Sequence, residues 1–341
     1  MTGAPTDMTA APEPAAAADA ADDLLSQVLG TVRLSGTVFL QGEFRTPWGV
    51  ASPTGPEIAA MLEPGARRLV LLHAVLEGEC TIALPSGVSV EARAGDVALM
   101  PNGDGHIMGS RDGTEWVGLA GLLPPKPWRQ VPVVRTGGTG ATTRILCAYL
   151  HCDPLATPWL LGALPPLFRV RPPPGPASTW LTASLGYAVA EADASRPGRA
   201  SVLSRLPELL FVDCLRQYAT ECADERLGWL AAMRDPALAR AVSALHAEPA
   251  RAWTVPALAR RAAVSRSILA ERFSHALGTT PMRYLARWRL QLAAHRLRTT
   301  GRSLAEIASE CGYGSEAAFS RAFRREAGDW PGAWRAGARA R

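Results

Sequence analysis

Two matched groups of side chains near the C-terminus, 50 residues apart, carry the hydrogen-bonding chemistry that contacts to bases and phosphates need. If each group lies on a helix, a rotation of about 100° per residue places its members on one outward face. These outward positions are Ser267, Glu271 and Ser274 in the first group and Ala317, Arg321 and Arg324 in the second. Arg321 can bond to O6 and N7 of guanine, and Glu271 can accept from the amino group of cytosine or orient a neighbouring arginine. The pattern indicates contact with double-stranded DNA.

Further candidate positions flank these two groups. Ala270 and Ser320 lie at the edges of the two outward faces. Arg266, at the start of the first helix, is expected to contact phosphate, as are Arg324 and Arg325, because guanidinium groups bond well to phosphate oxygens. The alternative is a face of arginines that is merely solvated.

The helices that must carry these side chains are predicted by an internal repeat. Six positions recur at a spacing of 50: Ser265, Leu269, Phe273, Gly278, Pro281 and Tyr284 match Ser315, Phe319, Phe323, Gly328, Pro331 and Trp334. One helix earlier, Leu258-Ala259 matches Ile307-Ala308 at a spacing of 49, so the second turn is one residue longer. Each copy is typical of a helix-turn-helix, in which a serine caps the second helix.

Capping residues and helix breakers predict where the helices begin and end. We expect caps at Asp235 and Thr254 and helices over Ser265–Leu277, Pro281–Thr299, Ser303–Gly312 and Ser315–Gly328. The long helix, counted from Met282 to Thr299, would be about 27 Å long. Successive major grooves on one face of DNA are about 34 Å apart. A helix of this length can therefore present two recognition helices to one face of a duplex.

The charge of the chain is distributed unevenly. The 341 residues carry a net charge of +5. From Asp235 onward the sequence holds 18 Arg and 8 acidic residues, which gives +10 and leaves −5 for the rest. A basic module on an acidic body is typical of nucleic-acid binding. Because Lys126 is the single lysine, the arginine bias can also reflect a GC-rich genome.

The repeat resembles the AraC/XylS family of bacterial transcription regulators. In the second copy the matching residues are Ala305–Tyr313, Phe319, Phe323-Arg324-Arg325, Gly328 and Pro331, and in the first copy they are Phe273, Gly278, Thr280-Pro281 and Tyr284-Leu285. The resemblance covers about residues 235–335. It implies two helix-turn-helix units on one long connecting helix, with their second helices in successive major grooves.

Residues 23–165 are predicted to form a β domain. Short apolar or alternating runs lie between Gly- and Pro-containing turns, and they are Thr37–Phe44, Arg68–Leu76, Cys80–Leu84, Val88–Ala92, Val97–Met100, Glu115–Leu119 and Thr143–Leu150. Many short strands at this spacing favour a sandwich or a small barrel. The Pro-rich run Arg171–Pro176 then ends the domain.

The β domain is similar to a cupin, and in particular to the cupin-6 type that AraC-type regulators use as an effector-binding module. The second cupin motif is matched by Gly95, Pro101-Asn102-Gly103 and His106, with Ser110 at its final Asn position. In the first motif His73 takes the first histidine position, Val75 replaces the second, and Glu79 falls near the carboxylate position. The resemblance implies His73, Glu79 and His106 as candidate effector-binding residues.

The same three side chains raise the alternative of a cupin-type metal-dependent enzyme whose helical part serves assembly. A metal oxygenase needs about three protein ligands with open positions, and the missing second histidine argues against one. We therefore expect no catalytic residue, metal or cofactor. The identity of a small-molecule effector cannot be derived from these residues.

A helical segment, residues 177–232, is expected between the two domains. Its second helix, Ser201–Cys222, places Leu203, Leu206, Leu210, Cys214 and Leu215 on one apolar stripe. This stripe can pack on the β domain or on a second copy, and we favour a homodimer. Coupling between sensing and DNA binding is expected in the following segment, Asp224–Met233.

The N-terminal residues, the absence of long apolar runs and the cysteines indicate the cellular compartment in which the protein is expected. Residues 1–22 lack the basic start and apolar core of a signal peptide and are expected to be a disordered tail of a cytoplasmic protein. No apolar run is long enough to span a membrane. Six cysteines in such a chain do not predict a disulfide framework. Cys147 and Cys152 would face opposite sides of a regular strand, so a thiol-based redox-responsive regulator remains the weaker alternative.

The predicted fold class is multidomain α+β: a cupin-like β-barrel at residues 23–165, then the helical segment at 177–232, then an all-α domain at 235–338 with two helix-turn-helix units. The predicted function is sequence-specific DNA binding that regulates transcription, with an effector sensed by the cupin domain. Its partners would be double-stranded DNA, a small effector, a second copy of the chain and, in an activator, RNA polymerase.

Overall fold

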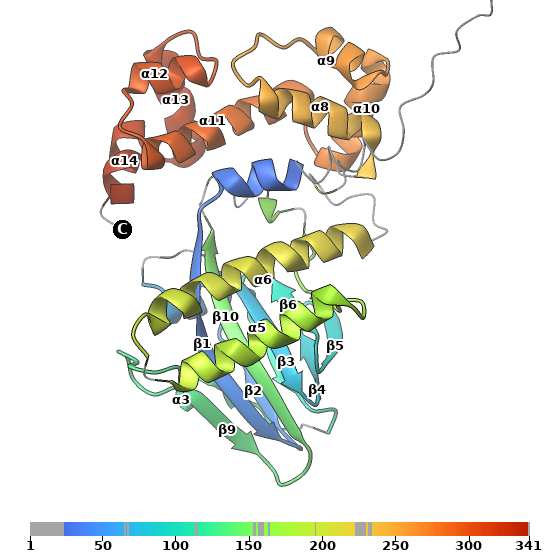
Figure 1. Cartoon of the computed structure of the whole chain (residues 1–341), viewed down its shortest axis with the longest axis vertical. Helices are drawn as coiled ribbons and strands as arrows, with labels where there is room; N and C mark the ends of the chain where they lie inside the picture. Colours follow the sequence, from blue (N-terminus) through green and yellow to red (C-terminus); the bar gives the residue numbers. More distant parts are fainter. Residues whose placement is uncertain are drawn as a thin grey trace, which may run out of the picture. The chain divides into compact units, whose positions relative to one another are not determined.

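A computed structural model describes residues 24–339, apart from 65, 67, 113–114, 153–154, 156–159, 163, 195, 222–229 and 231–233. The chain forms two compact units, Val32–Asp224 and a unit that combines Met1–Thr31 with Glu225–Arg341 (Figure 1). The expected disordered tail lies outside the described residues. So does the expected coupling segment Asp224–Met233, except for Leu230.

Two sheets build the first unit. The larger sheet has the order β11-β6-β3-β10-β1-β9, with strands Phe168–Val170, Val97–Met100, Val70–Glu77, Thr142–Cys152, Leu34–Arg45 and Val133–Gly137. The smaller sheet has the order β5-β4-β7-β2-β8, with strands Ser89–Arg93, Glu79–Ala83, Ile107–Gly109, Gly49–Ala51 and Val117–Gly118. Each of the seven expected runs contains or overlaps a strand, and the multidomain α+β architecture is confirmed.

The core of this unit contains side chains from both sheets. Phe44 stacks on Trp48 with ring centroids 4.3 Å apart, and both side chains are buried. Strand β3 is buried along most of its length rather than at alternate residues. This follows because one face of the larger sheet meets the core and the other meets helices.

Two long helices, α5 (Pro176–Asp193) and α6 (Arg199–Glu221), cover the outer face of the larger sheet (Figure 1). Helix α6 packs on β1 and β10, and its apolar stripe is buried within its own unit. The stripe therefore packs on the β domain and is not available for the homodimer contact that the sequence favoured. The described residues of this unit also include two shorter helices, α2 (Gly55–Leu62) and α3 (Leu119–Leu122). Among the described residues, no helix is both long and apolar enough to cross a membrane.

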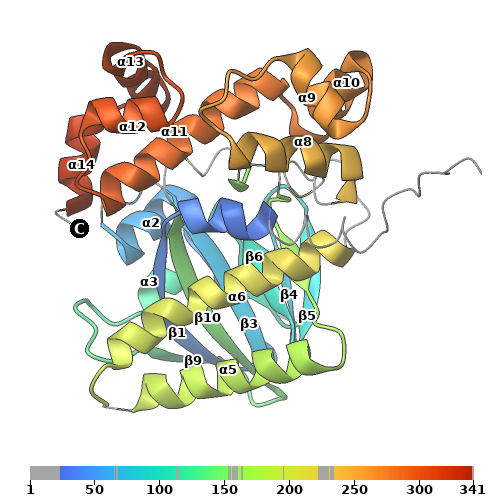
Figure 2. The ribbon, with the colours of Figure 1, turned by 45° about the horizontal axis from the view of Figure 1, so that its top comes forward.

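The C-terminal part of the second unit contains the helices α8 (Pro236–Ala247), α9 (Val255–Ala262), α10 (Arg266–Leu277), α11 (Pro281–Thr299), α12 (Leu304–Glu310), α13 (Glu316–Ala327) and α14 (Pro331–Arg339). Figure 2 shows α8, α9 and α10 towards one end of α11 and α12, α13 and α14 towards the other. The predicted caps are confirmed, because Asp235, Thr254, Ser265, Ser303 and Ser315 each accept a bond from the first turn of their helix.

The turn between α12 and α13 is longer than the turn between α9 and α10, as the repeat predicts. The two turns also place different residue types in the left-handed backbone conformation. The first turn uses Ala263, with φ of 57°. The second uses Gly312, with φ of 77°. A side chain at such a φ is strained, so the alanine in the first turn is the less favourable of the two solutions.

One described segment of the second unit comes from the other end of the chain. Residues 24–31 are helical, and Leu24 and Val28 are fully buried. The carbonyl of Thr31 accepts bonds from Gln291 Nε2 at 3.1 Å and from Arg298 Nη2 at 3.2 Å. We expected these residues in the cupin-like domain, whereas their recorded hydrogen bonds are with the helical unit.

Candidate DNA-binding surface and ligand-binding cleft

Helix α10 presents the first predicted recognition face. Ser265 Oγ accepts from the N–H of Ile268 at 3.2 Å, which starts the helix. Leu269 and Phe273 are buried on its inner side. The predicted contact residues of this helix are exposed on its other sides: Arg266, Ser267, Ala270, Glu271 and Ser274.

Helix α13 presents the second face in the same way. Phe319 and Phe323 are fully buried and pack edge to face, with ring centroids 5.6 Å apart. The predicted contact residues lie away from this pair: Ala317, Arg321, Arg324 and Arg325 are exposed, and Ser320 is half-buried. Each helix therefore exposes the side chains that were nominated on it.

Ion pairs and ring contacts distinguish arginines that are held from those that are free to reach DNA. Arg272 Nη1 lies 2.9 Å from Asp235 Oδ1, so it ties α10 to the cap of α8. Arg324 stacks over the ring of Trp330 at 4.6 Å, a contact that the helical wheel did not reveal. Among the described residues no ion pair is recorded for Glu271 or Arg321. The proposed role of Glu271 in orienting a neighbouring arginine thus has no ion pair to support it.

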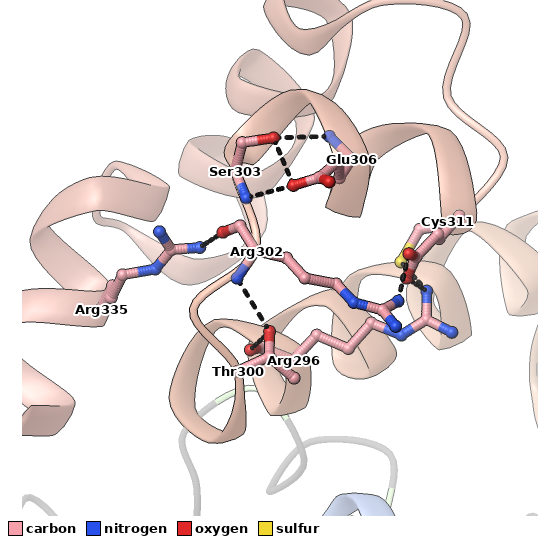
Figure 3. A network of polar contacts seen from close by, with 8 residues as sticks. Arg296, Thr300, Arg302, Ser303, Glu306, Cys311 and Arg335 are labelled. Atoms are coloured by element: carbon pink, nitrogen blue, oxygen red, sulfur yellow. Dashed lines mark hydrogen bonds and ion pairs between the residues drawn. The ribbon is translucent and has the colours of Figure 1, made fainter.

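A polar network braces α12 beside the second turn (Figure 3). Ser303 and Glu306 cap each other reciprocally, with Glu306 Oε2 accepting from the Ser303 N–H at 2.7 Å. These bonds lower the pKa of Glu306. Arg302 and Arg296 both pair with Glu310, and Arg296 also reaches Cys311 Sγ at 3.7 Å. The network joins α11 to α12, a link that spacing alone did not predict.

The three candidate effector residues are not brought together. His73 and His106 are buried side by side, with their Nε2 atoms 3.0 Å apart. Cys147 faces His73 across the β3–β10 pair and contacts its Nδ1 at 3.0 Å. Glu79 is exposed on β4 and lines a cleft. Within the described residues, no group of three or more His, Cys, Asp or Glu side chains could hold a metal ion.

That cleft has a volume of about 620 Å³ and is lined by β4, β5, the start of β10 and residues 110–112, together with Arg169 on β11 and the adjacent Arg171. Asp96, which is fully buried, accepts from Arg171 Nε and Nη2 at 2.7 and 2.6 Å and from Arg169 Nη1 at 3.2 Å. Burial would raise the pKa of this carboxyl, but the bonds from Arg171, the Arg93 N–H and Arg169 outweigh it and leave the pKa lowered. Both arginines and Arg93 line the cleft.

Sequence reasoning missed these arginines because their shared partner, Asp96, is more than 70 residues away along the chain. The available signal was weak. Arg169 and Arg171 alternate with apolar Phe168 and Val170, as expected for a strand with one polar face.

Comparison with known proteins agrees with both halves of this architecture. Residues 23–220 match the cupin model of the cupin-6 type, and residues 258–337 match a helix-turn-helix domain model. The chain is 29% identical over 308 residues to the HTH-type transcriptional regulator AlkR of Acinetobacter baylyi, covering 89% of this chain and 96% of AlkR.

Two further likenesses are more local. An AraC-like transcription regulator of Streptomyces lividans is 42% identical over 180 residues, 52% of this chain and 58% of that protein. The DNA-binding domain of AdpA, solved in complex with a target DNA, is 34% identical with a TM-score of 0.29, covering 30% of this chain and 92% of that domain.

The cupin match covers more than half of the chain, and the helix-turn-helix match covers the repeat that carries the exposed recognition helices. The relatives named above are transcription regulators. The chain is a DNA-binding transcription regulator, and it belongs to the AraC-type family whose members join an N-terminal cupin domain to a C-terminal helix-turn-helix domain.

Proposed function

We propose that this regulator reads two adjacent major-groove segments of one duplex with α10 and α13, and that a small effector in the cupin domain biases its activity. The observation that carries the first part is the repeated recognition helix, capped by Ser265 and Ser315 and exposed on the nominated face. The effector would act by binding more tightly to one of two states of the regulator. The protein would act in the cytoplasm, where bacterial DNA lies.

Within this proposal the two helices contribute unequally. Arg321 is the principal base contact, because an unpaired arginine can form two bonds to guanine. Arg266, Arg324 and Arg325 bond phosphate, and the stacking of Arg324 on Trp330 fixes its position. Ser267, Glu271 and Ser274 make weaker polar contacts, with Ala270, Ala317 and Ser320 close to the bases.

The test begins with the full chain and a pool of random-sequence duplexes, from which the preferred site is selected and footprinted. Arg321→Ala should cost about 1–3 kcal/mol at one cognate base pair and relax specificity there. Arg283→Ala is the matched control, because Arg283 is an exposed arginine on α11, outside α10 and α13. Equal weakening of Arg321→Ala on all sequences would make Arg321 a phosphate contact instead.

The second part of the proposal places the effector in the cleft that Glu79, Arg93, Arg169 and Arg171 line. The cleft is lined by four arginines, Arg93, Arg111, Arg169 and Arg171, and three carboxylates, Glu79, Glu91 and Asp112. Arg111 pairs with Glu91, and Arg169 and Arg171 pair with Asp96, whereas no ion pair is recorded for Arg93 among the described residues, so Arg93 would bind a carboxylate or phosphate group of the effector. The candidate residue Glu79 would contact its polar part. Buried His73 and His106 would support the barrel behind it rather than touch the effector.

A thermal-shift panel of small carboxylates, phosphate esters, neutral sugars and amines checks this assignment on the full chain. Stabilisation by an anionic compound that is lost in Arg93→Gln supports the cleft. Arg135→Gln is the control, because Arg135 lies exposed on β9 at the opposite edge of the larger sheet. A neutral or cationic effector, or an anion effect retained in Arg93→Gln, would refute it.

We also propose a homodimer formed by the outer faces of α5 and α6. Tyr187 is 50% exposed and Leu209 is 57% exposed, and Trp180 is exposed nearby on α5. Sedimentation of the wild type against Leu209→Glu tests this directly, since a monomeric wild type would contradict it. If the regulator activates transcription, we expect it also to contact RNA polymerase.

A further inference from the structure

Arg289 projects from the middle of α11 towards a loop of the first helix-turn-helix unit. Its Nε donates to the carbonyl of Pro249 at 2.7 Å, and its Nη2 donates to the carbonyl of Arg251 at 3.0 Å. Both acceptors lie in the loop between α8 and α9. The side chain is half-buried, so these bonds are more protected from solvent than those of an exposed arginine.

The same guanidinium also lies against the second helix-turn-helix. A Cβ added to Gly312 would lie 2.8 Å from Arg289 Nη2 and 2.8 Å from the Cα of Ala250. Gly312 belongs to the turn between α12 and α13. Arg289, Ala250 and Gly312 therefore form a direct contact between the loop of one unit and the turn of the other.

The loop that receives Arg289 is itself held in place. The Trp253 indole donates to the carbonyl of Glu248 at 3.0 Å, and the Trp253 N–H donates to the carbonyl of Arg251 at 2.8 Å. Arg251 stacks over the Trp253 ring at 4.2 Å. The carbonyls that Arg289 binds are thus in a fixed position relative to α8 and α9.

The next question is what holds the two helix-turn-helix units, α8–α10 and α12–α14, relative to each other. Among the described residues, α8, α9 and α10 pack mainly on each other, with α8 also on α11, whereas α12, α13 and α14 all pack on α11. Two ion pairs also hold the second helix-turn-helix to α11: Arg296 lies 2.8 Å from Glu310, and Arg287 lies 3.4 Å from Glu326. Arg289 adds a contact between the two helix-turn-helix units, because its guanidinium lies against both the loop between α8 and α9 and Gly312.

We infer that Arg289 is a positioning residue that sets the separation and relative rotation of α10 and α13, and thereby the spacing between the two DNA segments that the regulator accepts. This inference rests on the proposed function, in which both helices read one duplex. Arg289 acts through the loop and through Gly312 and touches no base. It determines specificity for spacing rather than for sequence.

The experiment uses the full chain and the site selected from random duplexes, together with duplexes that carry one base pair more or one fewer between the two footprinted segments. One base pair changes the separation by about 3.4 Å and the rotation by about 35°. The wild type should bind the altered duplexes about tenfold more weakly than the selected site, a cost similar to that of a mismatch. Arg289→Met should narrow this ratio to about threefold or less while also weakening the selected site.

Two variants separate this role from loss of charge or folding. Arg283→Met removes the same charge from an exposed position of α11, and its spacing ratio should equal that of the wild type. Arg289→Lys keeps the charge but has one donating nitrogen in place of the two that Arg289 uses. Its spacing ratio should therefore lie between those of Arg289→Met and the wild type. An unchanged ratio in both Arg289 variants would overturn the inference. A wild-type footprint limited to one groove segment would instead refute the two-helix reading itself.

Discussion

The Sγ atom of Cys147 lies 3.0 Å from Nδ1 of His73, and these two atoms begin a chain of hydrogen bonds through the cupin core. His73 Nε2 meets His106 Nε2 at 3.0 Å, and His106 Nδ1 meets the carbonyl of Asp104 at 2.9 Å. A carbonyl only accepts, so Nδ1 of His106 carries the proton. His106 Nε2 then accepts from His73, and His73 Nδ1 accepts from the thiol. The chain satisfies each of these groups with both rings neutral.

This arrangement predicts loss of stability in mild acid. Burial lowers the pKa of both His73 and His106, whereas an unfolded histidine titrates near 6.5. Below that pH the unfolded chain binds protons that the folded chain refuses, so the free energy of unfolding falls as the pH falls. Each ring that stays neutral should cost up to about 1.4 kcal/mol per pH unit, a limit approached as the unfolded histidine becomes fully protonated. Hydrogen exchange of β3 and β10 in urea between pH 6.5 and 5.5 measures the slope.

The control for this prediction is an exposed histidine outside the cupin domain. His275→Gln, at an exposed position of α10, should leave the pH dependence of the cupin domain as it is. His106→Gln should be destabilised at pH 7.5 but show a shallower slope. A flat stability between pH 6.5 and 5.5 in the wild type would show that the rings are not held neutral.

The thiols of the cupin core should react slowly. Burial raises the pKa of Cys80 to about 12 and raises the pKa of Cys147 as well, and the thiolate is the reactive form. In the native protein both should react with a disulfide reagent at least about 100-fold more slowly than in urea. Cys147→Ala should lower the number of titrated thiols by one after unfolding and leave the early reaction unchanged.

The contrary result has a clear meaning. If peroxide consumed a thiol of the folded protein within seconds and altered its DNA binding, the alternative of a redox-responsive regulator would be favoured. The variant Cys147→Ala would then show whether this thiol is the one that reacts.

The helical half of the molecule could be predicted well, since its signals are local. Each capping serine or threonine lies within three residues of the N–H that it satisfies, so sequence spacing reveals it. The buried Phe273 and Phe323 follow from the same periodicity. These local rules also predict which sides of α10 and α13 are exposed.

The features that could not be predicted depend on contacts between distant segments. Arg289 binds two carbonyls whose direction depends on the conformation of the 248–253 loop. Glu79 lies near His73 in sequence, yet it faces the cleft because residues along β4 alternate between the core and the outside. The apolar stripe of α6 predicts burial but not which partner covers it.

A salt-dependence experiment separates phosphate contacts from base contacts on α13. Arg325 is exposed, and we expect it to bond a phosphate. Arg325→Gln should therefore weaken binding to all duplexes about equally and reduce the slope of log affinity against log salt by about one. A loss confined to one base pair would assign Arg325 to base recognition instead.

The helical segment 24–31 leads to the last prediction, which concerns the integrity of the DNA-binding unit. Val28 is fully buried in this segment, whereas Ser26 is exposed on it. Val28→Asp buries a charge without a partner, so it should release the segment and with it the Thr31 carbonyl that Gln291 and Arg298 bind on α11. Hydrogen exchange should then accelerate in α11, and DNA affinity should fall.

Ser26→Asp adds the same charge to the same helix at a solvated position, and it should leave both measurements near the wild-type values. Equal exchange in the two variants would mean that residues 24–31 contribute nothing to the stability of α11. A Val28→Asp protein that exchanges faster in β1 but not in α11 would assign the segment to the cupin domain. The paired variants therefore decide to which unit the segment contributes stability, because both add one carboxylate to the same helix and only Val28→Asp disrupts its buried side.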